Sequence, residues 1–242
     1  MASKVKFPLQ FPSLLVLGAG LLLAAWAADD LAQTNAAARQ ELFDLRVERA
    51  VDNLKRRLVQ YEKGVRGARG AVVAVGVEHL NYETFQRYSA TRQYTSEFPG
   101  ARGFGFIRRV PVSEEARFLL RLQREQRSHQ AIRFLEPHTH DRWVIEYIEP
   151  EADNLSAVGL DIASESNRRN AMLQAVDRGE ATLTHPITLV QASGKTNQGF
   201  LLVLPIYRQD GKDIGNADLI PPAERQASAV ALAYAPLVIE EV

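Results

Sequence analysis

The chain has 242 residues, of which 46% are hydrophobic and 24% charged, the composition of an ordinary globular protein with room for one substantial domain and an accessory element. The 29 basic residues balance the 29 acidic ones. We therefore expect no nucleic-acid partner, which would favour a basic stripe. The sequence contains no cysteine, which excludes disulfides, thiolate catalysis and cysteine-ligated zinc.

The first 28 residues predict a transmembrane anchor in the inner or plasma membrane. Residues 7–28 contain no charged side chain, and these 22 residues exceed the ~20 that a helix needs to cross a bilayer. Lys4 and Lys6 precede them, and basic flanks stay in the cytoplasm, so the remainder should lie in the periplasm or outside the cell. The alternative is a cleaved signal peptide, because Ala25-Trp26-Ala27 resembles a cleavage site.

Residues 29–75 predict a long stalk helix. Apolar residues alternate four and three positions apart, as in the a/d seam of a coiled coil. Such a helix either pairs with the same helix of a second copy, giving a homodimer, or packs on its own domain. The seam residues are Val47, Val51, Leu54, Leu58, Tyr61 and Val65.

Residues 76–242 predict an α+β domain, in which an antiparallel sheet is flanked by helices. Ser113 is a candidate N-cap for a helix that reaches about Arg127, Ser164 is a candidate cap for a later helix, and Gly179 is its stop signal. In chain order the pattern predicts a helix at 81–94, a strand at 103–112, a helix at 113–127, strands at 131–137 and 142–150, a helix at 164–179, strands at 181–191 and 199–208, a loop at 209–226 and a strand at 229–239.

Two glycine-containing motifs do not support nucleotide binding. In "ASGKTNQG", residues 192–199, a phosphate-binding loop would need glycine at Leu189 and a following helix, whereas a strand is expected. A polar hairpin loop fits better. Gly103 and Gly105 would need a third glycine at Arg108 to bind a dinucleotide, so Gly105 is interpreted as a point where a neighbouring strand crowds the backbone.

No catalytic or metal-binding group stands out. His138 and His140 have the spacing of a metal pair on a strand, but a solvated loop is the better interpretation because the segment offers no third histidine. His185 either lines a cavity or satisfies a backbone carbonyl, and the second role is favoured. No serine occupies a nucleophile elbow, and the carboxylates show no converging pair. We therefore predict a binding protein without catalytic residues, metal or cofactor.

Several ordered blocks carry a family resemblance. The sequences "FPGARGFGFIRRVP", "YIEPEADNLSAVGLDIASESNRRNAM", "ATLTHPITLVQ" and "GFLLVLPIYR" together resemble the CHASE domain over about residues 47–239. This resemblance implies a long helix leading into PAS-like α+β units outside the membrane. It also implies an extracellular sensory module that binds a small ligand and relays the event to a cytoplasmic kinase, diguanylate cyclase or phosphodiesterase.

The resemblance also implies ligand contacts. In the plant cytokinin receptors of this family, the ligand lies against the central sheet, and the matching positions here are Thr184, Val190 and Val203. A ligand-binding aspartate of those receptors falls on Arg168, which makes cytokinin an unsuitable ligand and an anion a suitable one. The alternative is that Arg168 points to solvent from an exposed helix face.

The two strands around "ASGKTNQG" are apolar on both faces, so they either line a cavity or are covered on both sides. Leu202 and Leu204 join the predicted ligand contacts, and the other predicted walls are Leu183, Leu189 and Phe200. We expect a membrane-anchored extracytoplasmic sensor whose second span and effector lie outside this sequence. The alternatives are an exported hydrolase using carboxylates near Glu146–Glu151, and a membrane-tethered stand-alone binding protein.

Overall fold

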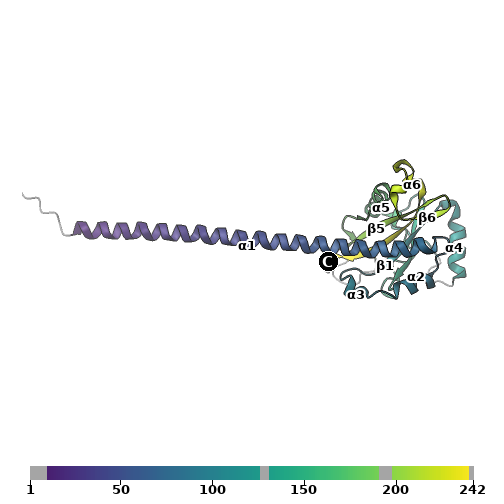
Figure 1. Ribbon diagram of the computed structural model, residues 1–242, viewed down its shortest axis with the longest axis horizontal. Helices are drawn as coiled ribbons and strands as arrows, with labels where there is room; N and C mark the ends of the chain where they lie inside the picture. Colours follow the sequence, from purple (N-terminus) through teal and green to yellow (C-terminus); the bar gives the residue numbers. More distant parts are fainter. Residues whose placement is uncertain (1–9, 126–130, 191–197, 240–242) are drawn as a thin grey trace, which may run out of the picture. The chain divides into compact units, whose positions relative to one another are not determined.

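The computed structural model describes residues 10–125, 131–190 and 198–239 (Figure 1). The chain divides into two units, Met1–Lys55 and Arg56–Val242, and the second contains the sheet. The helices are α1 (Gln10–Val75), α2 (Tyr82–Ser89), α3 (Tyr94–Glu97), α4 (Glu115–Arg124), α5 (Ser166–Arg178) and α6 (Arg225–Ser228), with short 3-10 helices at Val112–Glu114, Ile162–Ser164, Ala217–Leu219 and Pro222–Glu224. The strands are β1 (Phe104–Val110), β2 (Arg142–Glu149), β3 (Thr182–Leu183), β4 (Ile187–Thr188), β5 (Gln198–Gln209), β6 (Lys212–Ile214) and β7 (Ala229–Val238).

The strands form one sheet in the order β2-β1-β7-β5-β3, and β4 and β6 also pair with β5. Every pair is antiparallel. Together with the helices this confirms the predicted α+β class, and the arrangement is compatible with a PAS-like fold. The strand expected after "ASGKTNQG" is β5, although residues 192–197 of that loop lie outside the described residues.

The first unit contains the N-terminal part of α1. This part includes a stretch that is long and apolar enough to cross a membrane. Leu15, Leu22 and Trp26 are exposed there, as lipid-facing side chains would be. Val51 and Leu54 of the predicted seam are exposed as well.

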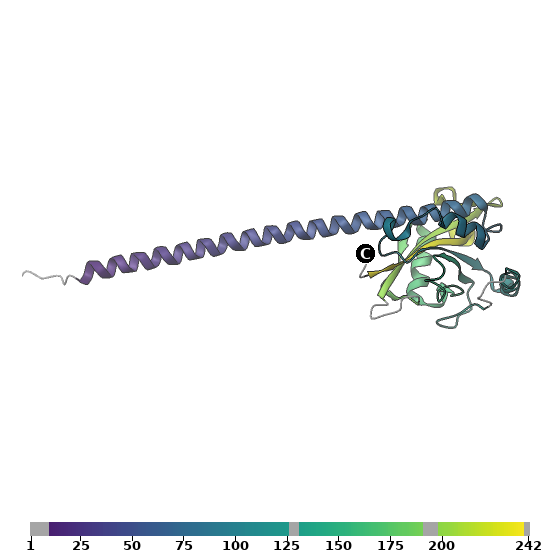
Figure 2. The same cartoon turned by 90° about the horizontal axis from the view of Figure 1, so that it is seen from below.

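In the second unit, the last turns of α1 cover one face of the sheet (Figure 2). Tyr61 and Val65 are fully buried against Leu204 and other strand residues, so this part of the predicted seam packs on its own domain. Ala233 and Ala235 of β7 lie beneath the helix and let it approach the sheet closely. Gly76, with φ of 88°, ends α1, because an L side chain rarely adopts this conformation.

Helix α5 covers the opposite face (Figure 2). Its residue Val176 is buried against the sheet, and the Tyr207 hydroxyl donates to the Val176 carbonyl oxygen at 2.6 Å. Gly179 ends the helix with φ of 76°, as predicted. The cap, however, is Glu165, whose carboxylate accepts from two backbone N–H groups of the first turn. The prediction of Ser164 was wrong, because its hydroxyl bonds elsewhere.

Other predicted elements differ from the structure. The expected helix at 81–94 is interrupted, since α2 ends at Ser89 and α3 begins at Tyr94. Residues 131–137 form a single bridge, Arg133 to Leu160, instead of a strand. Ser113 lies inside a 3-10 helix and does not cap α4, which ends at Arg124. The predicted loop at 209–226 contains β6, which was not predicted.

Gly105 lies in β1 between β2 and β7. A Cβ at this position would overlap the Tyr234 ring and the Tyr147 carbonyl oxygen. The interpretation of Gly105 as a crowded strand position is therefore confirmed.

Candidate functional site: an arginine-lined cleft

A cleft of about 840 Å³ opens beside α4, at the end of β1 and the start of β7. Six arginines and three carboxylates line it, together with a smaller number of apolar side chains. The arginines come from β1, α4 and β5, and are Arg108, Arg109, Arg117, Arg121, Arg124 and Arg208. The carboxylates are Glu78, Glu114 and Asp141.

A buried ion triad forms part of the cleft wall. Arg108 donates through Nε to Oε2 of Glu146, and Arg121 Nη2 lies 2.7 Å from Oε1 of the same carboxylate. The Glu146 side chain is fully buried. Burial alone would raise the pKa of Glu146, but the charges of Arg108 and Arg121 outweigh burial and lower it. The carboxylate is therefore ionised at neutral pH.

Arg121 connects this triad to the surface. Burial lowers its pKa, but Glu146 and Glu125 outweigh that effect, and the net pKa is raised. Its Nη1 lies 3.5 Å from Oε1 of Glu125, and its guanidinium lies over the Phe118 ring at 5.3 Å. A third of its side chain remains exposed, so a ligand in the cleft has access to this cation.

Two arginines of the cleft lining connect to Val77, the second residue after α1. Arg108 Nη2 donates to the Val77 carbonyl oxygen at 2.9 Å. The Val77 N–H donates to Oδ2 of Asp213 at 2.6 Å, and Oδ1 of the same carboxylate accepts from Arg208 Nε at 2.8 Å. Arg208 also pairs with Glu78 at 3.0 Å. The backbone that follows α1 is therefore bonded directly to one arginine of the cleft and, through Asp213, to another.

The remaining arginines differ in how firmly they are held. Arg109 forms a two-nitrogen contact with Asp141, at 2.9 and 2.8 Å, and donates to two backbone carbonyls. Arg117 pairs with Glu114 at the surface, where its side chain is 78% exposed. Arg124 makes no ion pair with another residue in the part of the chain that the structure describes. Arg117 and Arg124 can therefore turn toward a ligand at little cost.

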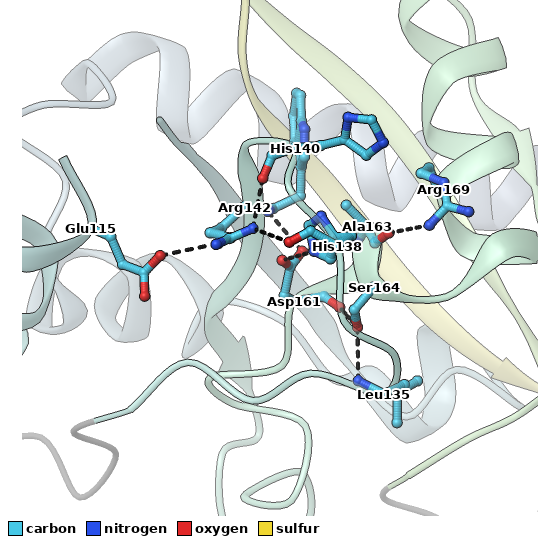
Figure 3. A network of polar contacts seen from close by, with 10 residues as sticks. Glu115, Leu135, His138, His140, Arg142, Asp161, Ala163, Ser164 and Arg169 are labelled. Atoms are coloured by element: carbon cyan, nitrogen blue, oxygen red, sulfur yellow. Dashed lines mark hydrogen bonds and ion pairs between the residues drawn. The ribbon is translucent and has the colours of Figure 1, made fainter. Parts of the chain in front are cut away.

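A second polar network includes Glu115, the first residue of α4 (Figure 3). Asp161 is fully buried; it accepts from two backbone N–H groups, and its Oδ2 lies 2.8 Å from Nε2 of His138. Arg142 donates to the carbonyl oxygens of His138 and His140 and to Glu115. The prediction of a solvated loop was wrong for His138, whose side chain is 6% exposed. This network fixes the loop before β2.

The polar residues among the predicted ligand contacts, Arg168 and Thr184, form hydrogen bonds within the protein. Arg168 is buried and donates to Glu165 at 3.1 Å and to the Thr188 carbonyl oxygen at 2.8 Å. The alternative that it points to solvent was wrong. Burial lowers the pKa of Arg168, and Glu165 offsets part of this effect. Oγ1 of Thr184 is also buried and accepts from the Leu201 N–H at 3.0 Å.

The apolar residues of that set lie on two faces of the sheet. Val203 belongs to the core beneath α5, and Val190 packs against the same core. Leu202 and Leu204 belong to the core beneath α1, because successive strand residues point to opposite faces. These four side chains do not face one common cavity. Their contact with a ligand, like that of Thr184 and Arg168, stays a prediction.

The family model described as CHASE domain matches residues 78–242, which is more than half of the chain. The chain belongs to the CHASE domain family. The CHASE domain is an extracellular sensory domain of signalling receptors, which agrees with the function expected from the sequence. A search of curated proteins finds no match. The arginine-lined cleft lies within the matched CHASE residues except for Val77.

The arginine-lined cleft was not among the predicted sites. A signal was present, because Arg117, Arg121 and Arg124 are spaced four and three apart and so share one face of a helix. Arg108 and Arg109 lie in a strand that otherwise reads as apolar. What brings the two groups together is the packing of α4 on Val110 and Val144, which no local pattern predicts.

Proposed function

We propose that this CHASE domain is the ligand-sensing part of a membrane-anchored receptor and that it binds a small anionic molecule in the arginine-lined cleft. The domain would lie outside the membrane, anchored by the apolar part of α1. It would relay ligand binding to a cytoplasmic kinase or cyclic-di-nucleotide enzyme outside this sequence. The observation that carries the proposal is the cleft itself, with six arginines in its lining.

The electrostatics of the cleft favour an anion. Glu146 holds Arg108 and Arg121 from behind, so their guanidinium groups are fixed in place before any ligand arrives. Fixed guanidinium donors recognise carboxylates and phosphates through paired hydrogen bonds. Arg117 and Arg124 supply further donors at the open side of the cleft. Two fixed arginines with two more mobile arginines beside them suit a small ligand that enters from solvent.

The contacts of Val77 supply a route from the cleft to α1. An anion that takes over the Nη2 donor of Arg108, whose Nε stays bound to Glu146, would weaken the bond to Val77, and one that draws Arg208 toward itself would weaken the bond to Asp213. The turn after α1 would then shift, and α1 would shift with it. A ligand changes such an equilibrium only by its difference in affinity for the two arrangements. In a homodimer joined by α1, that shift would reach the membrane.

The sheet face around Thr184, Val190 and Val203 is the second candidate location, on the strength of the family resemblance. A ligand there would have to displace packed side chains, since Val203 is fully buried. The hydrolase alternative has less support, because Glu146 is held by two arginines and Glu149 lines a different cleft.

A thermal-shift screen tests the proposal. The full chain in detergent micelles would be melted with succinate, citrate, phosphate and pyrophosphate, and with adenine, adenosine and neutral amino acids for comparison. A ligand at a hundred times its Kd stabilises the folded state by about 2.7 kcal/mol, which is readily measured. We expect an anion to raise the melting temperature of the wild type, and to raise that of Arg124→Gln about half as much at the same concentration, since a tenfold weaker Kd leaves about 1.4 kcal/mol of stabilisation. If only neutral purines stabilised the protein, and did so equally in Arg124→Gln, the result would favour a ligand site on the sheet face instead of the cleft.

A further inference from the structure

The charges of the arginine-lined cleft match a ligand with a single anionic group. Five of its six arginines form ion pairs with carboxylates, as Arg109 does with Asp141. Arg124 is the exception among the residues that the structure describes. It lies three positions after Arg121 on α4, so the two guanidinium groups are neighbours on one helix face. One carboxylate of a ligand can therefore accept from both.

A second negative charge on the ligand would meet carboxylates of the cleft itself. Glu78, Glu114 and Asp141 all belong to the lining. Like charges at close range repel each other. A second anionic group would also reach an arginine such as Arg109 or Arg208 only in competition with the carboxylate that this arginine already holds. The cleft therefore favours a monoanion over a dianion.

Apolar side chains make up most of the rest of the cleft lining. They come from the turn after α1, the end of β1, α4 and the segment that leads into β7. These residues are Val77, Val110, Pro111, Phe118, Leu120, Ala227, Ala229 and Val230. Val110, Phe118 and Ala229 are buried, whereas Leu120 is 54% exposed. A ligand that combines an anionic group with an apolar body would match both parts of this lining.

Leu120 lies on the arginine face of α4. It follows Arg117 by three positions and precedes Arg124 by four, and residues at these spacings are neighbours on a helix. The helix buries Phe118 and Leu122 instead. A single exposed leucine is ordinary on a protein surface, but this one lines a cleft among cations that recognise anions. A ligand that covers Leu120 removes apolar surface from water, which stabilises the complex.

The guanidinium groups of α4 favour an aromatic ring as the apolar body. Arg121 already lies over the ring of Phe118, at 5.3 Å from its centroid. Arg117 and Arg124 are exposed, and an arginine attracts the face of an aromatic ring through the cation–π interaction. An aryl ring beside Leu120 would therefore contact an apolar side chain and a cation at once.

We propose that the ligand of the arginine-lined cleft is a monocarboxylate with an arylalkyl body. This inference rests on the proposed function, because it names the class of anion that the cleft binds. The carboxylate accepts hydrogen bonds from Arg121 and Arg124, and the aryl ring packs against Leu120. The cleft volume of about 840 Å³ accommodates such a ligand.

Isothermal titration of the full chain in detergent micelles tests the class of ligand. The probe is 3-phenylpropionate at pH 7.5, and the heat of titration into protein-free micelles is subtracted. Three comparison compounds each change one property of the probe. Propionate lacks the ring, 3-phenylpropionamide lacks the charge, and benzylmalonate carries a second carboxylate. We expect 3-phenylpropionate to bind at least about tenfold more tightly than each of the three.

The possible results separate this inference from the proposed function. Binding of propionate or benzylmalonate as tight as that of 3-phenylpropionate would overturn the inference and leave an anion-binding cleft. If 3-phenylpropionate failed to bind while an anion of the thermal-shift screen bound, only the inference would fail. If the amide bound as tightly as the acid, or if no anion bound, the proposed function would fail with it.

Two matched variants locate the aryl ring. Leu120→Gln replaces the exposed apolar side chain by a polar one of similar size. It should weaken the binding of 3-phenylpropionate about threefold to tenfold and leave that of propionate unchanged. Leu219→Gln changes a leucine that is 55% exposed and lies outside the cleft lining, and it should bind as the wild type does. Equal affinity of Leu120→Gln and the wild type for 3-phenylpropionate would show that the ring binds elsewhere, which would overturn the proposal.

Discussion

Arg108 donates a hydrogen bond of 2.9 Å from its guanidinium to the carbonyl oxygen of Val77, and the same guanidinium is bound to Glu146. One side chain therefore connects the buried ion triad, the wall of the arginine-lined cleft and the turn that follows α1. This contact explains why a strand residue that would ordinarily be apolar is an arginine. It also defines where ligand binding and the position of α1 are coupled in our proposal.

We predict that Arg108→Ala destabilises the domain by about 3 kcal/mol, because it leaves Glu146 buried with one cation instead of two. Arg117→Ala, which removes an exposed pair with Glu114, should cost less than about 1 kcal/mol. Urea unfolding followed by the fluorescence of buried Trp143, in a Trp26→Phe background, measures both. Equal losses in the two variants would show that the buried triad contributes no more than a surface pair.

The pH dependence of the unfolding free energy should reveal the protonation of Glu146. Its pKa in the folded domain is lowered below the ordinary value of 4.5. Its contribution is therefore complete above about pH 4.5 and is lost as the pH falls through the lower folded value. Glu146→Gln lacks this contribution, so the difference in unfolding free energy between wild type and variant should be constant from pH 7 to pH 5 and shrink below pH 4.5. A difference that stays constant down to pH 3 would contradict this assignment.

Thr184→Val tests the structural role of a residue that the family resemblance places in the ligand site. The variant removes the oxygen that accepts from the Leu201 N–H and leaves that buried donor unpaired. We expect a loss of about 1–3 kcal/mol in unfolding free energy. Anion affinity measured by titration should be unchanged if the ligand binds in the arginine-lined cleft. A variant with wild-type stability and weakened affinity would instead favour the sheet face.

The exposed part of the α1 seam should mediate dimerisation. Val51→Glu combined with Leu54→Glu places charges in the seam, and we expect the full chain in micelles to change from dimer to monomer. Light scattering coupled to size-exclusion chromatography gives the protein mass. Arg49→Glu, on the outer face of the same helix, is the matched control and should leave the dimer intact. A monomeric wild type would remove the dimer from the account.

Much of the fold could be predicted because long strands and glycine stops leave local signals. Strands β1, β2, β5 and β7 follow apolar runs, and Gly179 ends α5 where the sequence indicated. The segment at 131–137 has a similar composition but pairs through one bridge. Side-chain contacts hold it instead: Arg133 donates to the Val158 carbonyl oxygen, and His138, just after the segment, contacts Asp161. Tertiary bonds of this kind leave no periodic pattern.

The candidate site was harder to predict from the sequence than the fold. The apolar alternation of β5 reads equally as a ligand cavity or as two packed cores, and the structure has Val203 in one core and Leu204 in the other. The cleft depends on where α4 lies against β1 and on the pairing of Arg121 with Glu146. Those residues are 25 positions apart and show no shared pattern in the sequence.

The central claim, that the arginine-lined cleft binds the ligand of this CHASE domain, is tested most directly by calorimetric titration of the best anion from the screen. Arg124→Gln removes a cleft cation without unpairing any described carboxylate, and Arg178→Gln, an exposed arginine at the end of α5, is its control. We predict that affinity falls about tenfold in Arg124→Gln and is unchanged in Arg178→Gln. Equal affinity in the wild type and both variants would contradict the account.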